Sequence, residues 1–337
     1  MRSSLDHRAM GVLSGGHLAV DFAQGMVPAM LPFLVLRFDL SYTLAAVLML
    51  AVTLSSSVVQ PLFGIVSDRR GALWLLPVGL AVAGAGVAAA AVVPVYAVVV
   101  VAVTIAGIGI AAYHPEGAKF AAFASGTERA KGMSLFSIGG NLGYGLGPLI
   151  ATPFIVWLGL EGALISLVPV LLLIVLVVRT TPRLRTLDTA AAAAPPVREG
   201  ASDDRWGAMA ILAAVIAIRS LAWFGLITFV PLWWVSRGHS EADGNHLLSA
   251  MLLTGAIGTI LVGRVGDRVG LRRTMIVTQA ALTPLILLFL LVGGPIGVIA
   301  LALVGMCVVG TFGVTLVLSQ LYLPRRVGLA SGLAIGL

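Results

Sequence analysis

GIVSDRRG at residues 64–71 and GRVGDRVG at residues 263–270 are two copies of one pattern, Gly-x-x-x-Asp-Arg-x-Gly, and each copy interrupts a long apolar region. The aspartates of the two copies are 199 residues apart. The same offset relates Pro32 to Pro231 and Ser41 to Ser240. A long internal repeat in an apolar chain is typical of transporters built from two related halves.

The composition places the chain in a lipid bilayer. Of its 337 residues, 59% are hydrophobic and only 10% are charged, and the mean hydropathy is +1.06, so too little polar surface is present for a soluble globule. The formal net charge is +7, but the basic residues are scattered at the ends of apolar stretches, which argues against nucleic-acid binding. The single cysteine, Cys307, excludes an intrachain disulfide.

Apolar stretches of about 20 residues predict an all-α polytopic membrane protein. The first stretch is longer than a signal-peptide core, so we expect it to remain as a span. We expect a six-span bundle at 1–179, a cytoplasmic linker at 180–206 and a partial second bundle at 207–337. The ten full spans are expected near 11–36, 43–66, 72–93, 95–115, 132–157, 160–179, 207–235, 246–266, 273–293 and 295–318.

The end of the chain predicts the start of an eleventh span. PRRVGLASGL at 324–333 parallels RAKGMSL at 129–135, which precedes the fifth span. By the arithmetic of the repeat about one and a half spans are missing from the second half, which suggests a truncated product or a fragment.

The distribution of Lys and Arg predicts the orientation. With the N-terminus in the cytoplasm, 18 of the 21 basic residues fall on the cytoplasmic side, whereas Arg37 and Arg237 fall outside and Arg219 lies within a span. We therefore expect a multi-pass protein of the plasma membrane with a cytoplasmic N-terminus.

Several short strings, together with the two loop motifs, resemble the major facilitator superfamily and, within it, the fosmidomycin-resistance branch of drug-efflux proteins. The strings are DFAQG at 21–25, LSYT at 40–43, QPLFG at 60–64, SDRR at 67–70, HPEGAK at 114–119 and GGNLG at 139–143. The resemblance extends over residues 15–337. It implies two six-helix bundles around a cavity that opens alternately to each side, commonly with proton antiport. The missing final spans depart from the family pattern.

Asp21 is the one acidic residue well inside a span. It lies about ten residues into the first span and hence about 15 Å deep. A charge at that depth costs roughly 2.5–3.5 kcal/mol, so it should face a cavity or a partner. We expect a proton-coupling carboxylate. The alternative is a structural acid bonded to His17 at i−4 or Gln24 at i+3.

Arg219 is the one basic residue in the middle of a span. The repeat offset maps Asp21 onto Ser220, so Asp21 and Arg219 have nearly the same depth and could face one another across one cavity. We expect Arg219 to hold an anionic group, such as a phosphonate or a carboxylate, with protonation of Asp21 altering that hold. A permanent ion pair between the two is the alternative. The expected substrate-binding residues are Arg219, His17, Gln24 and Asn141.

The repeated loop motif is a candidate cytoplasmic gate, in which each aspartate receives the positive end of a neighbouring helix and pairs with arginine. The expected gating residues are Gly64, Asp68, Arg69, Gly263, Asp267 and Arg268. Snorkelling topology charges are the alternative. The resemblance implies that Asp68 meets the start of the eleventh span near 328–331 and Asp267 the start of the fifth, so we expect Asp68 to lack its helix partner.

Small residues repeat every fourth position at Gly139, Gly143 and Gly147, followed by Pro148. This stripe resembles an antiporter signature, but close helix packing is its expected purpose, with Asn141 beside it lining the cavity. The polar residues that follow the fourth apolar stretch, His114, Glu116 and Lys119, are expected to form a solvated cluster at the interface rather than a metal or catalytic site.

These features predict a proton-coupled exporter of small drugs or metabolites, including anionic ones. An importer of the same architecture and a non-transporting truncated product are the alternatives. No catalytic triad, carboxylate pair, metal-spaced histidines or phosphate loop is apparent, so we expect no enzyme, cofactor or metal. The expected partners are the bilayer, a small substrate and the proton, without nucleic acid, and the chain is expected to be a monomer.

Overall fold

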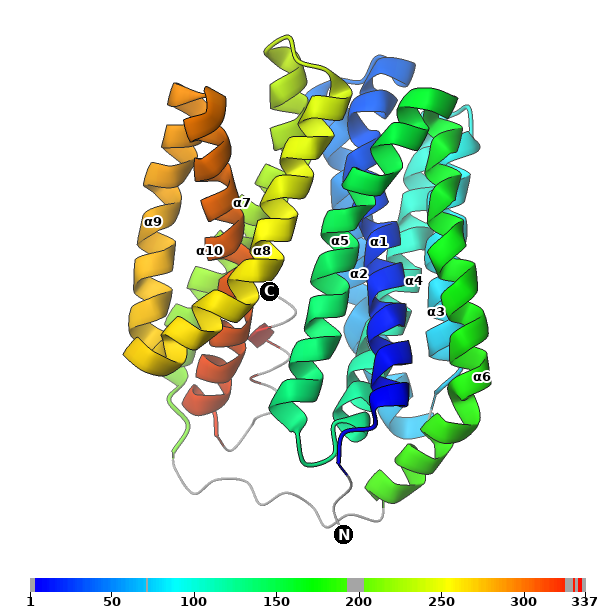
Figure 1. Cartoon of the computed structure of the whole chain (residues 1–337), viewed down its shortest axis with the longest axis vertical. Coiled ribbons are helices and arrows are strands. Elements are labelled where there is room, and N and C mark those ends of the chain that lie inside the picture. Colours follow the sequence, from blue (N-terminus) through cyan, green and yellow to red (C-terminus); the bar gives the residue numbers. More distant parts are fainter. Residues whose placement is uncertain (1–3, 71, 193–202, 325–329, 331–332, 335–337) are drawn as a thin grey trace. The chain divides into compact units, whose positions relative to one another are not determined.

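The structure, a computed structural model, describes residues 4–70, 72–192, 203–324, 330 and 333–334 (Figure 1). These residues form ten α-helices and one short 3-10 helix. The helices are α1 (His7–Phe38), α2 (Tyr42–Arg70), α3 (Leu75–Val92), α4 (Tyr96–Ala124), α5 (Arg129–Leu158), η1 (Gly159–Ser166), α6 (Leu167–Ala192), α7 (Trp206–Ser236), α8 (Glu241–Val269), α9 (Leu271–Val292) and α10 (Gly294–Tyr322).

Nine segments of the described chain are long and apolar enough to cross a bilayer, rather than the ten expected. The difference arises at Lys131–Leu187, a 57-residue segment that contains α5, η1 and α6. Gly159 turns the chain there with a φ of 73°, a left-handed conformation that glycine adopts without strain. Because η1 continues the helical backbone through this turn, no polar loop separates the two helices.

Two helices extend well beyond their expected ends. The fourth span was expected to end at Pro115, but α4 continues to Ala124, and α6 continues to Ala192 although its span was expected to end at 179. Proline lacks only one backbone donor, so a helix packed against its neighbours can continue through it. The segment expected to be a linker is therefore helical over residues 180–192, and its residues 193–202 lie outside the described part.

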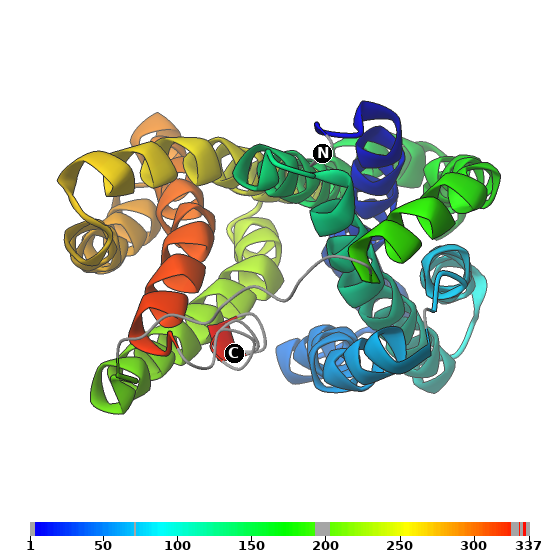
Figure 2. The same cartoon turned by 90° about the horizontal axis from the view of Figure 1, so that it is seen from below.

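The chain divides into two compact units, Met1–Ala194 with Pro231–His246, and Pro195–Val230 with Leu247–Leu337. Within the first unit, α1 packs against α3, α4, α5 and α6, while α2 packs on α4 (Figure 2). Within the second, α9 and α10 are neighbours, and Trp223 and Leu226 of α7 join their apolar core. The first unit thus encloses α1, the helix that carries Asp21.

The glycine stripe of α5 lies against the backbone of α1. A Cβ at Gly139 or Gly143 would collide with the carbonyl oxygen of Ser14 or Leu18, and one at Gly147 would lie 3.0 Å from Phe22 O. The small residues therefore allow the two backbones to approach, as expected from their spacing.

Large apolar side chains cover the outside of the helices. Trp157, Leu221 and Leu291 are 79%, 76% and 80% exposed. Such exposure is typical of a surface that faces lipid rather than water.

The expected start of the eleventh span lies mostly outside the described residues. Of this segment, Ala330 and Ala334 are described as buried, and they pack in the apolar core of the second unit with Leu212 and Ile216 of α7.

Candidate functional site

Asp21 lies between two histidines in the first unit, and we call His17, Asp21 and His114 the Asp21 cluster. Asp21 Oδ1 is 2.9 Å from His114 Nε2, and Oδ2 is 3.3 Å from His17 Nε2. The Asp21 side chain is only 14% exposed. α1 supplies His17 and Asp21 one turn apart, whereas α4 supplies His114 from 93 residues away. The alternative bond to His17 is therefore present, together with a second bond that was not expected.

The hydrogen bonds of the Asp21 cluster indicate one proton more than an ionised Asp21 and two neutral histidines would carry. His17 Nδ1 lies 2.8 Å from the carbonyl oxygen of Phe136, which can only accept, so Nδ1 carries a hydrogen. A neutral His17 would then direct the lone pair of Nε2 at the Asp21 carboxylate. The contact is favourable only when a proton lies on His17 Nε2 or on Asp21 Oδ2, a conclusion assigned from the hydrogen-bond network. His114 can donate from Nε2 as a neutral imidazole.

α5 closes the cluster from a third side. The Phe136 ring stacks on His17 with centroids 4.1 Å apart, and His114 meets His17 edge-on at 5.0 Å. At Gly140 a Cβ would collide with His17 and would lie 2.6 Å from Asp21 Oδ2. The cluster therefore occupies space that exists only because residue 140 has no side chain.

The ligand atoms of the three residues lie within 4.8 Å of one another, a spacing that also suits a metal ion. The direct nitrogen–oxygen contacts at 2.9 and 3.3 Å already pair these atoms, so shared protons account for the arrangement and we assign no ion to it.

The expectation of a solvated cluster at the end of the fourth span is wrong. His114 contacts Asp21 inside the bundle, and Glu116 is fully buried where Ser67 Oγ of α2 donates to its Oε2. Lys119 Nζ lies 3.9 Å from Glu116 Oε2 and donates to Ser67 O over 2.9 Å. Because α4 continues past Pro115, these polar residues face neighbouring helices instead of water.

The other two residues expected around Asp21 lie on α1 and α5. Gln24 is half-buried on α1, and Asp21 is hydrogen-bonded to the two histidines rather than to it in the described structure. Asn141 is half-buried on α5, directly after Gly140. Their part in substrate binding stays a prediction.

Arg219 is buried in the second unit. Its side chain is only 6% exposed, whereas Ile218 and Leu221 on either side are 70% and 76% exposed, so the guanidinium points away from the lipid-facing surface of α7. Arg219 Nη1 donates to Thr311 Oγ1 of α10 over 3.2 Å, and Gln279 Nε2 of α9 approaches the same oxygen at 3.5 Å.

The guanidinium of Arg219 has no described counter-ion. Within the described part of the chain, no carboxylate oxygen lies within 4.0 Å of it. A buried guanidinium that is held only by neutral groups retains donors and charge for an anion. The placement of Arg219 opposite Asp21 stays a prediction, because each residue is described within its own unit.

The gating residues are only partly described. Gly64 lies in α2, and Gly263, Asp267 and Arg268 lie in α8, where Asp267 and Arg268 are exposed. The side chains of Asp68 and Arg69 and the segment 325–329 are outside the described residues. The gate, including the absent helix partner of Asp68, stays a prediction.

Comparison with known proteins identifies the family of the chain. The model of the Major Facilitator Superfamily matches residues 13–337. The chain is 30% identical over 328 residues to the uncharacterized MFS-type transporter YfnC of Bacillus subtilis, covering 95% of this chain and 80% of that one. It is 26% identical over 332 residues to the fosmidomycin resistance protein of Escherichia coli K12, covering 97% and 82%.

Solved transporters share the fold at lower identity. A nucleoside transporter, NupG, superposes with a TM-score of 0.75 at 13% identity, over 98% of this chain and 87% of its own. A D-xylose-proton symporter superposes with a TM-score of 0.72 at 15% identity, over 99% and 87%.

Proposed function

The chain belongs to the Major Facilitator Superfamily of membrane transporters, and we propose that it exports small, negatively charged drugs or metabolites in exchange for protons. In this proposal the Asp21 cluster carries the proton and Arg219 holds the anionic substrate. The protein works by alternating access, as a monomer in the plasma membrane with a cytoplasmic N-terminus.

The observation that carries the proposal is the pair of contacts made by the His17 ring, with the Phe136 carbonyl oxygen at Nδ1 and with Asp21 at Nε2. The Phe136 carbonyl fixes the hydrogen of His17 on Nδ1, and the contact of His17 Nε2 with Asp21 then requires a proton between them. A bundle that loses this proton leaves a carboxylate against a lone pair in a poorly hydrated site. The loss therefore destabilises the conformation described, which gives proton release a means to favour a different conformation.

Arg219 supplies the second half of the coupling. A buried guanidinium held by Thr311 and Gln279 binds an anion through charge-assisted hydrogen bonds. For exchange, the proton and the substrate must be bound in alternate conformations, so the conformation that a proton on the Asp21 cluster favours is the one in which Arg219 releases the anion. Proton binding and anion binding thus influence each other if the two residues share a cavity, as the 199-residue repeat predicts.

The direction of transport is proposed from the relative that is a fosmidomycin resistance protein, because export is the direct way for a transporter to protect a cell from a drug. Import of a small organic metabolite uses the same machinery and is the alternative. A non-transporting protein is the other alternative. Inside-out and right-side-out vesicles distinguish all three, since export of fosmidomycin appears as uptake only in the inside-out preparation.

The loop motifs complete the proposal as a cytoplasmic gate. Gly64, Asp68 and Arg69 in the first half and Gly263, Asp267 and Arg268 in the second are placed at helix ends by the repeat. Each aspartate would pair with a helix start and with arginine in one conformation and separate in the other. Gln24 and Asn141 are proposed to line the cavity beside Asp21.

The test measures proton movement driven by substrate. Wild-type protein in inside-out vesicles that contain a pH-sensitive dye should alkalinise the lumen when fosmidomycin is added outside, because the drug enters in exchange for luminal protons. Asp21→Asn should abolish this response. Asp39→Asn is the matched control, because Asp39 is exposed, lies outside the cluster and has a φ of 50° that asparagine accepts readily. A normal response of Asp21→Asn would refute the proton role of the cluster.

A further inference from the structure

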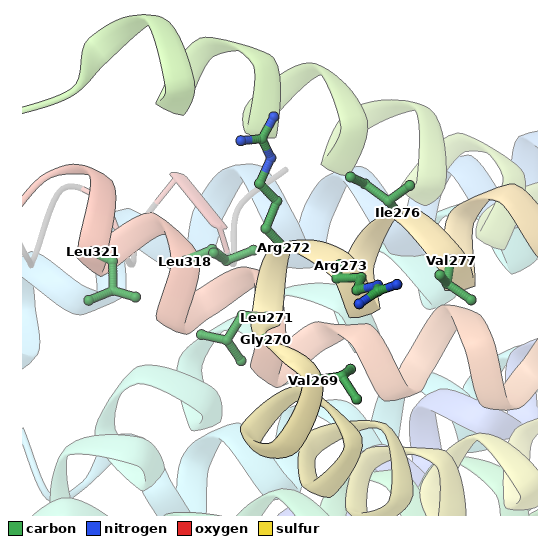
Figure 3. A pocket seen from close by; sticks show the side chains of 9 residues that line it. All are labelled: Val269, Gly270, Leu271, Arg272, Arg273, Ile276, Val277, Leu318 and Leu321. Carbon is green, nitrogen blue, oxygen red and sulfur yellow. The ribbon is translucent and has the colours of Figure 1, made fainter.

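A groove in the second unit is lined by apolar side chains and by two arginines. Its volume is about 650 Å³ and it lies where α8 ends, α9 begins and α10 ends (Figure 3). The apolar lining comes from all three helices, and the polar part consists of two adjacent arginines. The lining includes Gly270, Arg272, Arg273, Ile276, Val277 and Leu321.

Gly270 forms the turn between α8 and α9 beside the groove. This glycine is the one residue between α8 and α9, and its φ of 97° lets the chain reverse within a single position. Nothing lies within 4 Å of the place where its Cβ would be. The turn therefore leaves an unfilled space beside the first turn of α9.

The walls are exposed apolar side chains on membrane-spanning helices. Ile276, Val277 and Leu321 are 58%, 61% and 59% exposed. Each belongs to a segment long and apolar enough to cross a bilayer. These walls consequently face acyl chains rather than water.

The two arginines that line the groove carry uncompensated charge. Arg272 and Arg273 are both exposed, and the first turn of α9 contains no acidic residue. In the described structure no carboxylate oxygen lies within 4.0 Å of either guanidinium, whereas Arg183 and Lys131 of the first unit pair with Asp6 and Glu128. In Figure 3 the two arginines lie between Leu321 on one side and Ile276 and Val277 on the other, and their side chains extend in different directions.

We propose that this groove binds an anionic phospholipid, with Arg272 and Arg273 attracting its headgroup and an acyl chain along Ile276 and Val277. Two unpaired guanidinium groups favour a headgroup with net negative charge over a zwitterionic one. The apolar walls favour a lipid over a free phosphate ion, which would leave them unused. The proposal is independent of the Asp21 cluster and of transport direction.

Native mass spectrometry of the purified full chain tests the proposal, with phosphatidylglycerol and phosphatidylcholine added to the detergent micelles. The wild type should retain phosphatidylglycerol preferentially. The double variant Arg272→Gln with Arg273→Gln should retain at least about fivefold less of it. Arg8→Gln with Arg185→Gln removes the same charge from exposed arginines of the first unit and should behave as the wild type.

A second variant tests the space of the groove separately from the charge of its arginines. Val277→Trp fills the groove while keeping both arginines, so it should also lower phosphatidylglycerol retention. Equal losses in the two arginine double variants would overturn the proposal in favour of a general surface-charge effect. Equal retention of the two lipids by the wild type, or displacement of phosphatidylglycerol by inorganic phosphate, would overturn it as well.

Discussion

Gly140 of α5 lies directly against the carboxylate of Asp21, since a Cβ at position 140 would stand 2.6 Å from Asp21 Oδ2. Real Cβ contacts essentially never fall below 3.0 Å. The same Cβ would collide with the imidazole of His17. The glycine thus links the packing of α5 on α1 to the geometry of the Asp21 cluster.

Gly140→Ala should leave the protein folded but impair proton coupling. The atoms that must move belong to the ends of side chains, so α1 and α5 can keep their places while His17 and Asp21 separate. Overpacking costs about 1–3 kcal/mol. Where this cost falls on the contact between His17 and Asp21, proton-driven transport should decrease by about fivefold or more. Transport in vesicles measures the loss, and Gly11→Ala, where nothing lies within 4 Å, is the control. Equal activity of the two variants would contradict the close fit described here.

The two histidines of the cluster should not be equivalent. His17 must share an additional proton with Asp21, whereas His114 can donate to Asp21 Oδ1 as a neutral ring. Glutamine also donates an N–H but cannot bind another proton. We expect His17→Gln to lose proton-coupled transport by about tenfold or more and His114→Gln to lose less. The pH dependence of uptake into inside-out vesicles checks the order, and the reverse order would contradict the proton assignment at His17.

Hydropathy and the repeat were sufficient to predict the helical architecture, because a bilayer imposes segment length and apolar character on every span. The contact between Asp21 and His17 was predicted for a related reason, as one of two alternatives of which Gln24 was the other. A carboxylate deep in a span needs a partner, and residues one helical turn apart are neighbours.

His114 was missed because two physical facts are not visible in one sequence. It is 93 residues from Asp21, so only the packing of α4 on α1 brings them together. It also precedes Pro115, and proline after a long apolar stretch is usually read as the end of a span. The string of polar residues His114, Glu116 and Lys119 was a usable signal, since polar groups next to an apolar span either leave the bilayer or pair inside the bundle.

Arg219→Lys and Arg219→Ala should both impair transport of an anionic substrate. Lysine keeps the charge but loses the planar fork that pairs with two oxygens of a carboxylate or phosphonate, and alanine loses both. We expect losses of at least about tenfold for lysine and more for alanine, since hydrogen bonds to charged groups contribute about 1.5–3 kcal/mol. Fosmidomycin flux at matched expression measures the effect, with exposed Arg185→Lys as the control. Normal flux in both Arg219 variants would exclude a substrate role for this residue.

Asp6 should make the stability of the first unit depend on pH. Asp6 Oδ1 accepts from Ala9 N at 3.0 Å as the N-cap of α1, and Oδ2 accepts from Arg183 Nε of α6 at 2.6 Å. Partial burial opposes ionisation, but the bond and charge of Arg183 and the backbone donors outweigh it, so the pKa of Asp6 lies below the ordinary 3.8. A lowered pKa means that this contribution is complete above the ordinary range and is lost as the pH falls below it.

Asp6→Asn isolates the charge, because asparagine is an equally good N-cap but cannot form the ion pair. Near neutral pH the variant should be destabilised by less than about 1 kcal/mol, since the Arg183 side chain is 50% exposed and water screens the pair. Thermal unfolding in detergent between about pH 7 and pH 3 should show a smaller decrease in Tm for Asp6→Asn than for the wild type. The Asp39→Asn control should follow the wild type. An identical decrease in Asp6→Asn and the wild type would show that the Asp6–Arg183 pair does not contribute to the acid sensitivity of the fold.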